Sequence, residues 1–387
     1  MIFSRPELEL ILHCAKVKIP NAELKNIQDI LQQSIDWQYL ITTAKHHKVA
    51  PLIYLNFTKF FSKDIPPEVI AQLQKFVLAK TKKNLYFVKE LTTVINIFES
   101  HKISVIPYKG LILAAAVYGD ISLRQFVDLD FLVPTHQYLK AQSLLIAEGY
   151  ISPPQTNVDW EHSFVHPQKQ IGIDLHQGLT PAYLPFQINF LELWQRLETV
   201  SIGGIEVESF SSEDLLILLC VQLAKDAQWT AEVLIKVCDI AELIRVRSDI
   251  SWNVVWQRCH KSGTKRIVLF SLIIVEKLLK TEIPDIVQQK MYADSVAREA
   301  AERVCEEFFS RSEKSFKEKT YQERIFLRKL AKELWQNKYQ HFFKTIFTHK
   351  QQDFSPVYLP INLFFMYYLL KPSIFVYKFF SRTLKHD

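Results

Sequence analysis

The chain has 387 residues and is poor in glycine and in cysteine. Only 8 residues are glycine, whereas glycine usually makes up about 7% of a protein, so few positions suit the positive-φ turns that β-rich folds need. The 5 cysteines are scattered without a CxxC pair, which argues against a disulfide framework. We therefore expect a largely helical protein in a reducing compartment, the cytoplasm.

The sequence also lacks a strong charge of one sign and the common catalytic signatures. Its 47 basic and 41 acidic residues give a net charge of +6, spread along the chain, whereas a nucleic-acid-binding domain usually concentrates its basic residues. RNA is therefore the less favoured partner. Glu7 and Glu9 interrupt the N-terminal segment, where a secretory signal peptide needs an apolar stretch. No HExxH zinc motif, P-loop, GxSxG elbow or GxGxxG fingerprint occurs.

No hydrophobic run is long enough to cross a membrane. The most apolar part of the aromatic C-terminal segment runs from Asn362 to Leu370, between Pro360 and Pro372, and a spanning helix needs about 20 apolar residues. We expect no transmembrane segment and a tail, residues 351–387, that packs on the helices. Contact of its Phe, Tyr and Lys side chains with a membrane surface is the alternative.

The spacing of apolar residues divides the rest of the chain into three regions. Residues 1–100 and 211–350 show helical periodicity, while residues 101–210 contain short β-branched runs and the Gly203-Gly204 hairpin signal. We therefore predict an α/β unit over 101–210 between an N-terminal helical region and a C-terminal helical domain. The predicted helices are 6–17, 22–33, 37–48, 66–100, 110–118, 135–148, 212–228, 230–247, 251–261, 264–279, 285–310 and 320–347. The predicted strands are 103–107, 128–133, 162–166, 170–176, 198–202 and 205–210.

Two carboxylates are placed side by side in the predicted strand 128–133. Side chains alternate along a strand, so Asp128 and Asp130 share one face while Leu129 and Phe131 point to the other. Like charges held together in an apolar strand are costly unless a cation or protons neutralise them. Mg²⁺ would resolve that cost, since proteins usually hold it with one or two carboxylates and substrate phosphates.

The strand 170–176 repeats this arrangement. Gly172, Asp174 and His176 share one face, and Ile171 and Ile173 lie on the other. Asp174 is therefore positioned to complete a carboxylate triad with the first strand. Gly172 leaves space on the same face, where a ligand or a neighbouring backbone can approach.

Together these segments resemble the DNA polymerase β-like nucleotidyltransferase superfamily, in its branch of uncharacterised nucleotidyltransferases that carry a Lys-Gly motif. The resemblance covers roughly residues 100–210. It rests on a Lys-Gly pair, a Tyr followed by a small acidic turn, an Arg shortly before Asp-x-Asp, and a later Asp-Leu-His strand. In this chain these are Lys109-Gly110, Tyr118-Gly119-Asp120, Arg124, Asp128-Leu129-Asp130 and Asp174-Leu175-His176.

This resemblance implies an α+β fold with a small mixed-sheet core, flanked here by the helical regions. It also implies transfer of a nucleoside monophosphate from an NTP, with ATP the expected one, to a hydroxyl of a small-molecule or protein acceptor, releasing pyrophosphate and using Mg²⁺ or Mn²⁺. The implied catalytic metal ligands are Asp128, Asp130 and Asp174, and the implied nucleotide-binding residues are Lys109, Gly110, Arg124 and His176.

Several alternatives remain open at this point. Lys109-Gly110 stands where the superfamily usually has Gly-Ser, which removes a hydroxyl contact to phosphate, so the chain can also be a catalytically idle nucleotide-binding or antitoxin-like interaction module. Arg124 can instead be a structural partner of the aspartates, and His176 a core histidine. In the C-terminal helices, a possible acceptor-side group competes with ordinary solvated salt bridges. That group is Lys225, Lys236 and Asp239.

Overall fold

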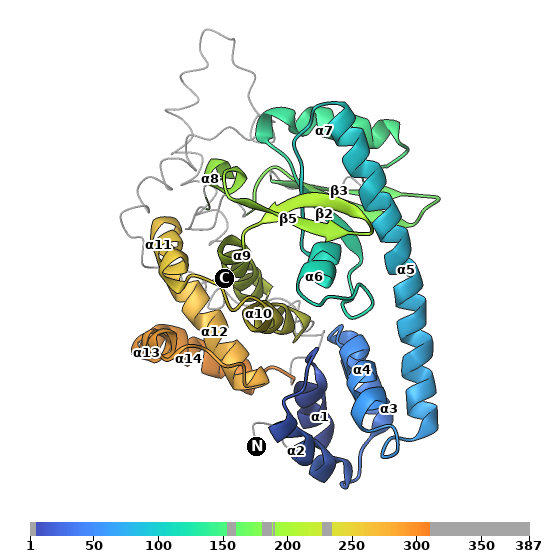
Figure 1. Cartoon of the computed structure of the whole chain (residues 1–387), viewed down its shortest axis with the longest axis vertical. Coiled ribbons are helices and arrows are strands. Elements are labelled where there is room, and N and C mark those ends of the chain that lie inside the picture. The colour runs from blue at the N-terminus through green and yellow to red at the C-terminus, as the bar shows by residue number, and fades with distance from the viewer. Residues whose placement is uncertain (1–4, 153–159, 180–187, 189, 227–233, 310–387) are drawn as a thin grey trace, which may run out of the picture. The chain divides into compact units, whose positions relative to one another are not determined.

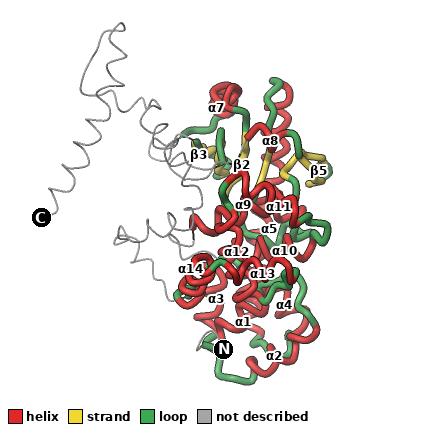
Figure 2. Tube along the Cα trace, turned by 90° about the vertical axis from the view of Figure 1, so that its left-hand side faces the viewer, coloured by secondary structure: helices red, strands yellow, loops and turns green. Residues whose placement is uncertain are grey.

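The computed structural model describes residues 5–152, 160–179, 188, 190–226 and 234–309 (Figures 1 and 2). All of them fall in one structural unit, Met1–Pro181 with Phe186–Ala331. The helix predicted over 320–347 and the tail 351–387 lie outside the described residues. The division of the chain into regions at 100, 210 and 350 stays a prediction.

The N-terminal region is helical, as predicted. Its helices are α1 (Pro6–Cys14), α2 (Asn21–Leu31), α3 (Trp37–His46), α4 (Ala50–Phe60) and the long α5 (Pro67–Ser100). The helix α4 is absent from the prediction. It follows a turn in which Lys48 has a φ of 61°, and Pro51 lies in its first turn, where proline needs no hydrogen-bond donor. Lys48 therefore lies in a bend between two helices.

A four-stranded mixed sheet forms the centre of the described chain. Its strands are β1 (Ile106–Tyr108), β2 (Asp128–Leu132), β3 (Glu161–His166) and β4 (Ile171–His176), in the order β1-β2-β4-β3. β2 and β4 run parallel, whereas β1 and β3 are antiparallel to their neighbours. The helix α6 (Gly110–Ala116) connects β1 to β2, and a 3-10 turn, η1 (Thr135–Gln137), leads into α7 (Tyr138–Ala147) after β2. The expected α+β fold with a small mixed sheet is confirmed.

A hairpin follows the sheet in sequence. After the short α8 (Phe190–Trp194), β5 (Leu197–Ile202) and β6 (Ile205–Phe210) pair antiparallel. Gly203 and Gly204 form the turn with φ angles of 57° and 87°, as their sequence predicts. A Cβ on Gly203 would lie 2.5 Å from Val88 of α5, so only glycine lets the hairpin approach that helix. Ser209 of β6 donates to the carbonyl of Pro107 at 3.2 Å, which joins the hairpin to β1.

One face of the sheet is apolar and belongs to the core. Leu129, Phe131, Ile173 and Leu175 alternate along β2 and β4 and are buried in one cluster with side chains of α5 and α7. Figure 1 shows α5 passing along the sheet, and its Phe98 ring meets the Phe131 ring edge-on, with centroids 6.1 Å apart. The apolar face therefore anchors the sheet and leaves the opposite face to polar side chains.

The C-terminal part is again helical. It comprises α9 (Ser212–Asp226), α10 (Leu234–Val246), α11 (Trp252–Ser262), α12 (Lys265–Leu279), α13 (Asp285–Ala293) and α14 (Ser295–Glu306). The prediction of one helix over 285–310 is wrong, because Asp294 separates α13 from α14 and caps α14 by accepting from the backbone amide of Ala297. Among the described helices, none combines the length and the hydropathy needed to span a bilayer.

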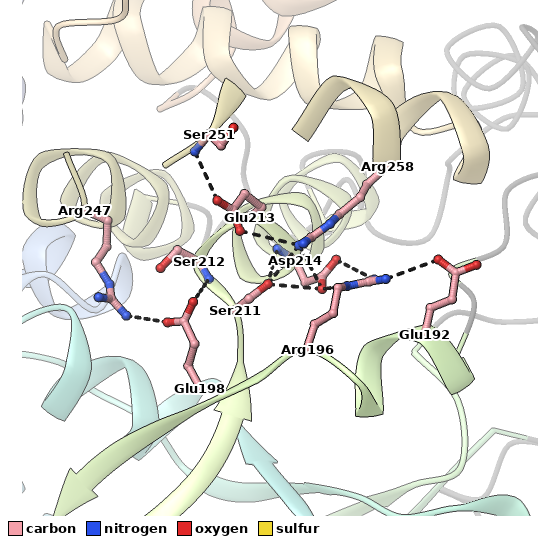
Figure 3. A network of polar contacts seen from close by, with 10 residues as sticks. All are labelled: Glu192, Arg196, Glu198, Ser211, Ser212, Glu213, Asp214, Arg247, Ser251 and Arg258. Atoms are coloured by element: carbon pink, nitrogen blue, oxygen red, sulfur yellow. Dashed lines mark hydrogen bonds and ion pairs between the residues drawn. The ribbon is translucent and has the colours of Figure 1, made fainter. Parts of the chain in front are cut away.

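Ion pairs fasten the hairpin and its preceding helix to the C-terminal helices (Figure 3). Asp214, at the start of α9, accepts from Arg196 at 3.0 Å and from Arg258 of α11 at 3.0 Å. Glu198 of β5 accepts from Arg247, just after α10, at 2.7 Å. Because these contacts join β5 and the residue just before it to α9, to the end of α10 and to α11, these helices are held in a defined position relative to the hairpin.

Candidate active site on the polar face of the sheet

The polar face gathers carboxylates because β2 and β4 pair in parallel register. Asp130 lies opposite Asp174, and Asp128 lies opposite Gly172, so the three carboxylates share one face. A Cβ on Gly172 would lie 3.6 Å from the Cβ of Asp128, in ordinary contact. Glycine therefore leaves the space beside Asp128 open, as its place in the sequence suggests.

Asp130 is the most strongly engaged of these carboxylates. It is buried, and its Oδ1 accepts from Nζ of Lys109 at 2.8 Å and lies 3.1 Å from Nε2 of His176. Burial by itself would raise the pKa of Asp130, but the charge of Lys109 and the contact with His176 outweigh it and hold that pKa well below its ordinary value. Asp130 is therefore ionised in the folded protein.

The other two carboxylates have the opposite electrostatic character. Burial, followed by repulsion from Asp130 and Asp174, raises the pKa of Asp128 to about 7. Burial and the charge of Asp130 likewise raise the pKa of Asp174. The charge of Lys109 lowers the pKa of both Asp128 and Asp174, but by less than the other causes raise it. The ionised forms of Asp128 and Asp174 are therefore unfavourable in this face unless a cation binds beside them.

Glu161 is a site residue that the sequence analysis missed. It begins β3 opposite His176, and its Oε2 lies 3.4 Å from Nδ1 of His176. Burial and the charge of Asp174 raise the pKa of Glu161 to about 7. The strand was predicted to begin at residue 162, so the acidic residue just before it was not placed on the face. Extending the period-two alternation of β3 by one residue would have found it.

His176 is completely buried and faces two carboxylates. Burial lowers its pKa to about 4, and Asp130 offsets only part of that effect, so the imidazole is neutral at pH 7. Its Nδ1 is a buried atom without an aligned hydrogen-bond partner, although Glu161 is 3.4 Å away. A neutral imidazole is a suitable ligand for a metal ion.

The donor set fits a divalent metal ion. In the part of the chain that the structure describes, Asp130, Asp174 and His176 each offer a ligand atom, and these atoms lie within 4.8 Å of one another. Carboxylate oxygens suit both Mg²⁺ and Mn²⁺, whereas imidazole is more typical of other transition metals. The sequence analysis expected Asp128 as the third metal ligand beside Asp130 and Asp174. In the structure the third converging donor belongs to His176, and Asp128 lies next to Asp130 on the same face of β2. Which of them bind metal stays a prediction.

Lys109 reaches Asp130 from a strained backbone. It lies between β1 and α6 with φ 61° and ψ −147°, a region that is essentially restricted to glycine and costs other residues about 1–3 kcal/mol. The neighbouring Gly110 has a φ of 22°, which other residues rarely adopt, and a Cβ there would lie 3.4 Å from the carbonyl oxygen of Asp128, in ordinary contact. Strain at a charged residue beside a carboxylate cluster is typical of functional sites. The roles of Lys109 and Gly110 in nucleotide binding stay predictions.

The structure pairs two predicted site residues, Arg124 and Asp239, with each other. Arg124 donates from Nε and Nη2 to the two oxygens of Asp239 at 2.7 and 2.8 Å, and Tyr118 donates to the same carboxylate at 2.7 Å. Arg124 also contacts the carbonyl of Gly110 at 3.3 Å. This buried fork ties α10 to the segment before β2. A direct contact of either residue with substrate stays a prediction.

Lys225 lies near the carboxylates of the face, and Lys236 lies near Lys225 and Lys109. Nζ of Lys225 lies 5.4 Å from the centroid of the Trp160 ring, and that ring lies 5.6 Å from the ring of His176. Lys236 forms an ion pair with Asp226. Two helices that are distant in sequence from the sheet therefore contribute cations to its polar face.

A family model described as uncharacterised nucleotidyltransferase matches residues 33–280. The match spans more than half of the chain and includes all of the site residues described above. None of the curated proteins and none of the solved structures matches this chain.

Proposed function

The chain belongs to the uncharacterised nucleotidyltransferase family, and we propose that it is a metal-dependent enzyme that transfers a nucleoside monophosphate from an NTP to a hydroxyl group and releases pyrophosphate. The observation that carries the proposal is the convergence of Asp130, Asp174 and His176 on one face of the sheet, with Lys109 beside them. Displacement at phosphorus depends mainly on positioning and charge neutralisation, and this group of side chains supplies both.

Each residue has a definite task in this reaction. Asp130, Asp174 and His176 would hold the divalent ion, which on binding would neutralise phosphate oxygens and lower the pKa of the acceptor hydroxyl. Lys109 would contact a phosphate as a point charge, in place of its present partner Asp130. Asp174, whose pKa is raised, would accept the proton of the hydroxyl as the new P–O bond forms and the bond to pyrophosphate breaks.

The donor chemistry also bears on the cofactor and the nucleotide. The carboxylates of Asp130 and Asp174 suit either of the two expected ions, Mg²⁺ or Mn²⁺. ATP is the expected NTP. The acceptor is a small molecule or a protein that offers a hydroxyl group.

The test combines binding with turnover. Protein is incubated with each α-labelled NTP, Mn²⁺ or Mg²⁺ and a pool of metabolites or lysate, and pyrophosphate release and label transfer are followed. In parallel, the melting temperature is measured with metal and NTP, which should raise it by linkage. The variant Asp128→Asn with Asp174→Asn should lose this rise. These two positions are preferred over Asp130, whose loss would leave Lys109 without its ion-pair partner.

The control is Asp29→Asn, an exposed aspartate on α2, which should keep the full metal-dependent rise. An unchanged rise in the double variant would remove the assignment of the metal site. If no NTP or metal changes the melting temperature of the unmodified protein, the enzyme proposal fails as a whole.

An idle nucleotide-binding or protein-interaction module is the second candidate. It is favoured by one observation, namely that Oδ1 of Asp130 is already contacted by Lys109 and His176, so that a metal ion must displace a bound cation. Under this alternative NTP raises the melting temperature, yet no acceptor pool yields pyrophosphate.

A further inference from the structure

Four lysines from four separate segments converge on the polar face of the sheet. Lys48 comes from the bend before α4, Lys109 from the start of α6, Lys225 from the last turn of α9 and Lys236 from α10. Burial, followed by the charges of Lys225, Lys109 and Lys48 in that order, lowers the pKa of Lys236 to about 7. The four ammonium groups therefore lie close enough to repel one another.

The lysines differ in whether a carboxylate forms an ion pair with them. Lys109 is paired with Asp130, and Lys236 with Asp226. Lys225 lies over the ring of Trp160, and among the described residues no carboxylate is within ion-pair distance of it. Burial and the charge of Lys109 lower the pKa of Lys225. Holding these partly buried charges together is unfavourable, and an anion bound between them would reverse that cost.

The lysines lie at different ends of the strand order β1-β2-β4-β3. Lys109 directly follows β1 and contacts Asp130 of β2. Lys225 lies instead over Trp160, which directly precedes β3, and it is attracted by Glu161, Asp130 and Asp174. An anion at Lys225 would therefore lie toward β4 and β3, on the side of Asp174, which the proposed function makes the proton acceptor for the attacking hydroxyl.

We propose that Lys225 and Lys236 bind an oxyanion group of the acceptor, a phosphate or a carboxylate. The acceptor is then an anionic hydroxyl compound, held by its anionic group while its hydroxyl faces Asp174. The assignment of this anion to the acceptor rests on the proposed function, but binding of an oxyanion to these lysines can be measured without nucleotide.

The experiment measures the binding of inorganic phosphate and of succinate, as phosphate and carboxylate probes, by calorimetry and by thermal shift. Each probe is titrated into the full chain alone and in the presence of saturating Mn²⁺ and the non-hydrolysable analogue α,β-methylene-ATP. The variants are Lys225→Met and Lys236→Met, with Lys225→Gln and Lys236→Gln as second substitutions in case the first do not fold. Lys82→Met, an exposed lysine on α5, is the matched control.

We expect at least one probe to bind both with and without the analogue, and each lysine variant to bind it at least ~10-fold more weakly, as for loss of one charge-assisted hydrogen bond. The affinity for the analogue should change by less than about 3-fold, well below the loss of such a bond. Which probe binds distinguishes a phosphate from a carboxylate acceptor. Lys82→Met should match the unmodified protein.

Three results would overturn the inference. Equal probe affinity in the variants and the unmodified protein would show that these lysines bind no oxyanion. Probe binding that the analogue abolishes, or a loss of analogue affinity of about 10-fold in Lys225→Met, would assign the lysines to the triphosphate instead. Failure of the analogue to bind at all would contradict the proposed function, while the nucleotide-free titrations would still decide on the oxyanion site.

Discussion

Substitution of Lys109 tests whether its backbone is strained in order to place the ammonium group at the site. Lys109 has φ 61° and ψ −147°, which costs a residue with a Cβ about 1–3 kcal/mol. Lys109→Gly and Lys109→Met both remove the ammonium group and its 2.8 Å contact with Asp130. The difference in stability between the two variants therefore isolates the backbone from the ion pair.

The expected difference has an unusual sign. Glycine costs roughly 0.5–1 kcal/mol more chain entropy on folding than other residues, and relief of the strain should exceed that. Lys109→Gly should thus be more stable than Lys109→Met by roughly 1 kcal/mol, equal to a melting temperature about 1–2 °C higher for a chain of this length. Urea denaturation of both variants measures the difference directly.

The same pair of substitutions at Lys82 provides the control. Lys82 lies inside α5, where glycine costs about 1 kcal/mol relative to good helix formers, so Lys82→Gly should be the less stable variant. A Lys109→Met protein as stable as Lys109→Gly, or more so, would refute the reasoning that strain is stored at this position.

The two Lys109 variants should also separate metal from nucleotide binding. Without NTP, Mn²⁺ should bind more tightly than to the unmodified protein, because no ammonium group has to leave Asp130. Affinity for NTP should fall by the ~1.5–3 kcal/mol of a charge-assisted bond. Unchanged NTP affinity would leave Lys109 as a structural partner of Asp130 alone.

Two further predictions concern stability. Asp128 has a folded pKa of about 7 against an ordinary value of 3.8, so its ionisation opposes folding and its contribution to stability falls as the pH rises from about 4 to about 7. Without metal, the melting temperature of the unmodified protein relative to that of Asp128→Asn should therefore fall over this range, and a flat difference between the two proteins would contradict this. Asp239→Asn should lower the free energy of unfolding, measured by urea denaturation, by about 3–5 kcal/mol. The reason is that the substitution removes the carboxylate charge that compensates the buried guanidinium of Arg124. A loss below about 1 kcal/mol would show that the pair contributes little.

The sheet and its polar face could be predicted because their signals are local. Alternation with period two is visible within a single strand, so Asp128 and Asp130 could be assigned to one face before any pairing was known. The same holds for Asp174 and His176 in β4. The parallel register that places Asp130 opposite Asp174 depends on chain segments 44 positions apart, and the sequence alone only made that pairing plausible.

The remaining features depend on tertiary contacts that leave no local pattern. The partner of Arg124 is Asp239 of α10, 115 residues away, rather than either nearby aspartate. Lys48 reaches the site from a bend between α3 and α4 that was predicted as the end of a single helix. Its charge is near Asp128 only because the N-terminal helices pack beside the sheet, and nothing in its own segment indicates this.

The last prediction separates catalysis from nucleotide binding through Asp174. In Asp174→Asn, Asp130 and His176 still offer two of the three converging donor atoms, and Lys109 is unchanged, so metal and NTP should bind in weakened form. The carboxylate that would take the hydroxyl proton is gone, however, and transfer should fall at least ~100-fold, the low end of what a positioned acid or base contributes. Glu161→Gln is the informative comparison, because Glu161 is also a carboxylate with a raised pKa, contacts His176 and is not one of the converging donors. Its transfer rate should fall less than that of Asp174→Asn. If instead Glu161→Gln is the more damaged variant and Asp174→Asn keeps its turnover, then the proton acceptor is the residue on β3, and the division of labour proposed for the two strands is wrong.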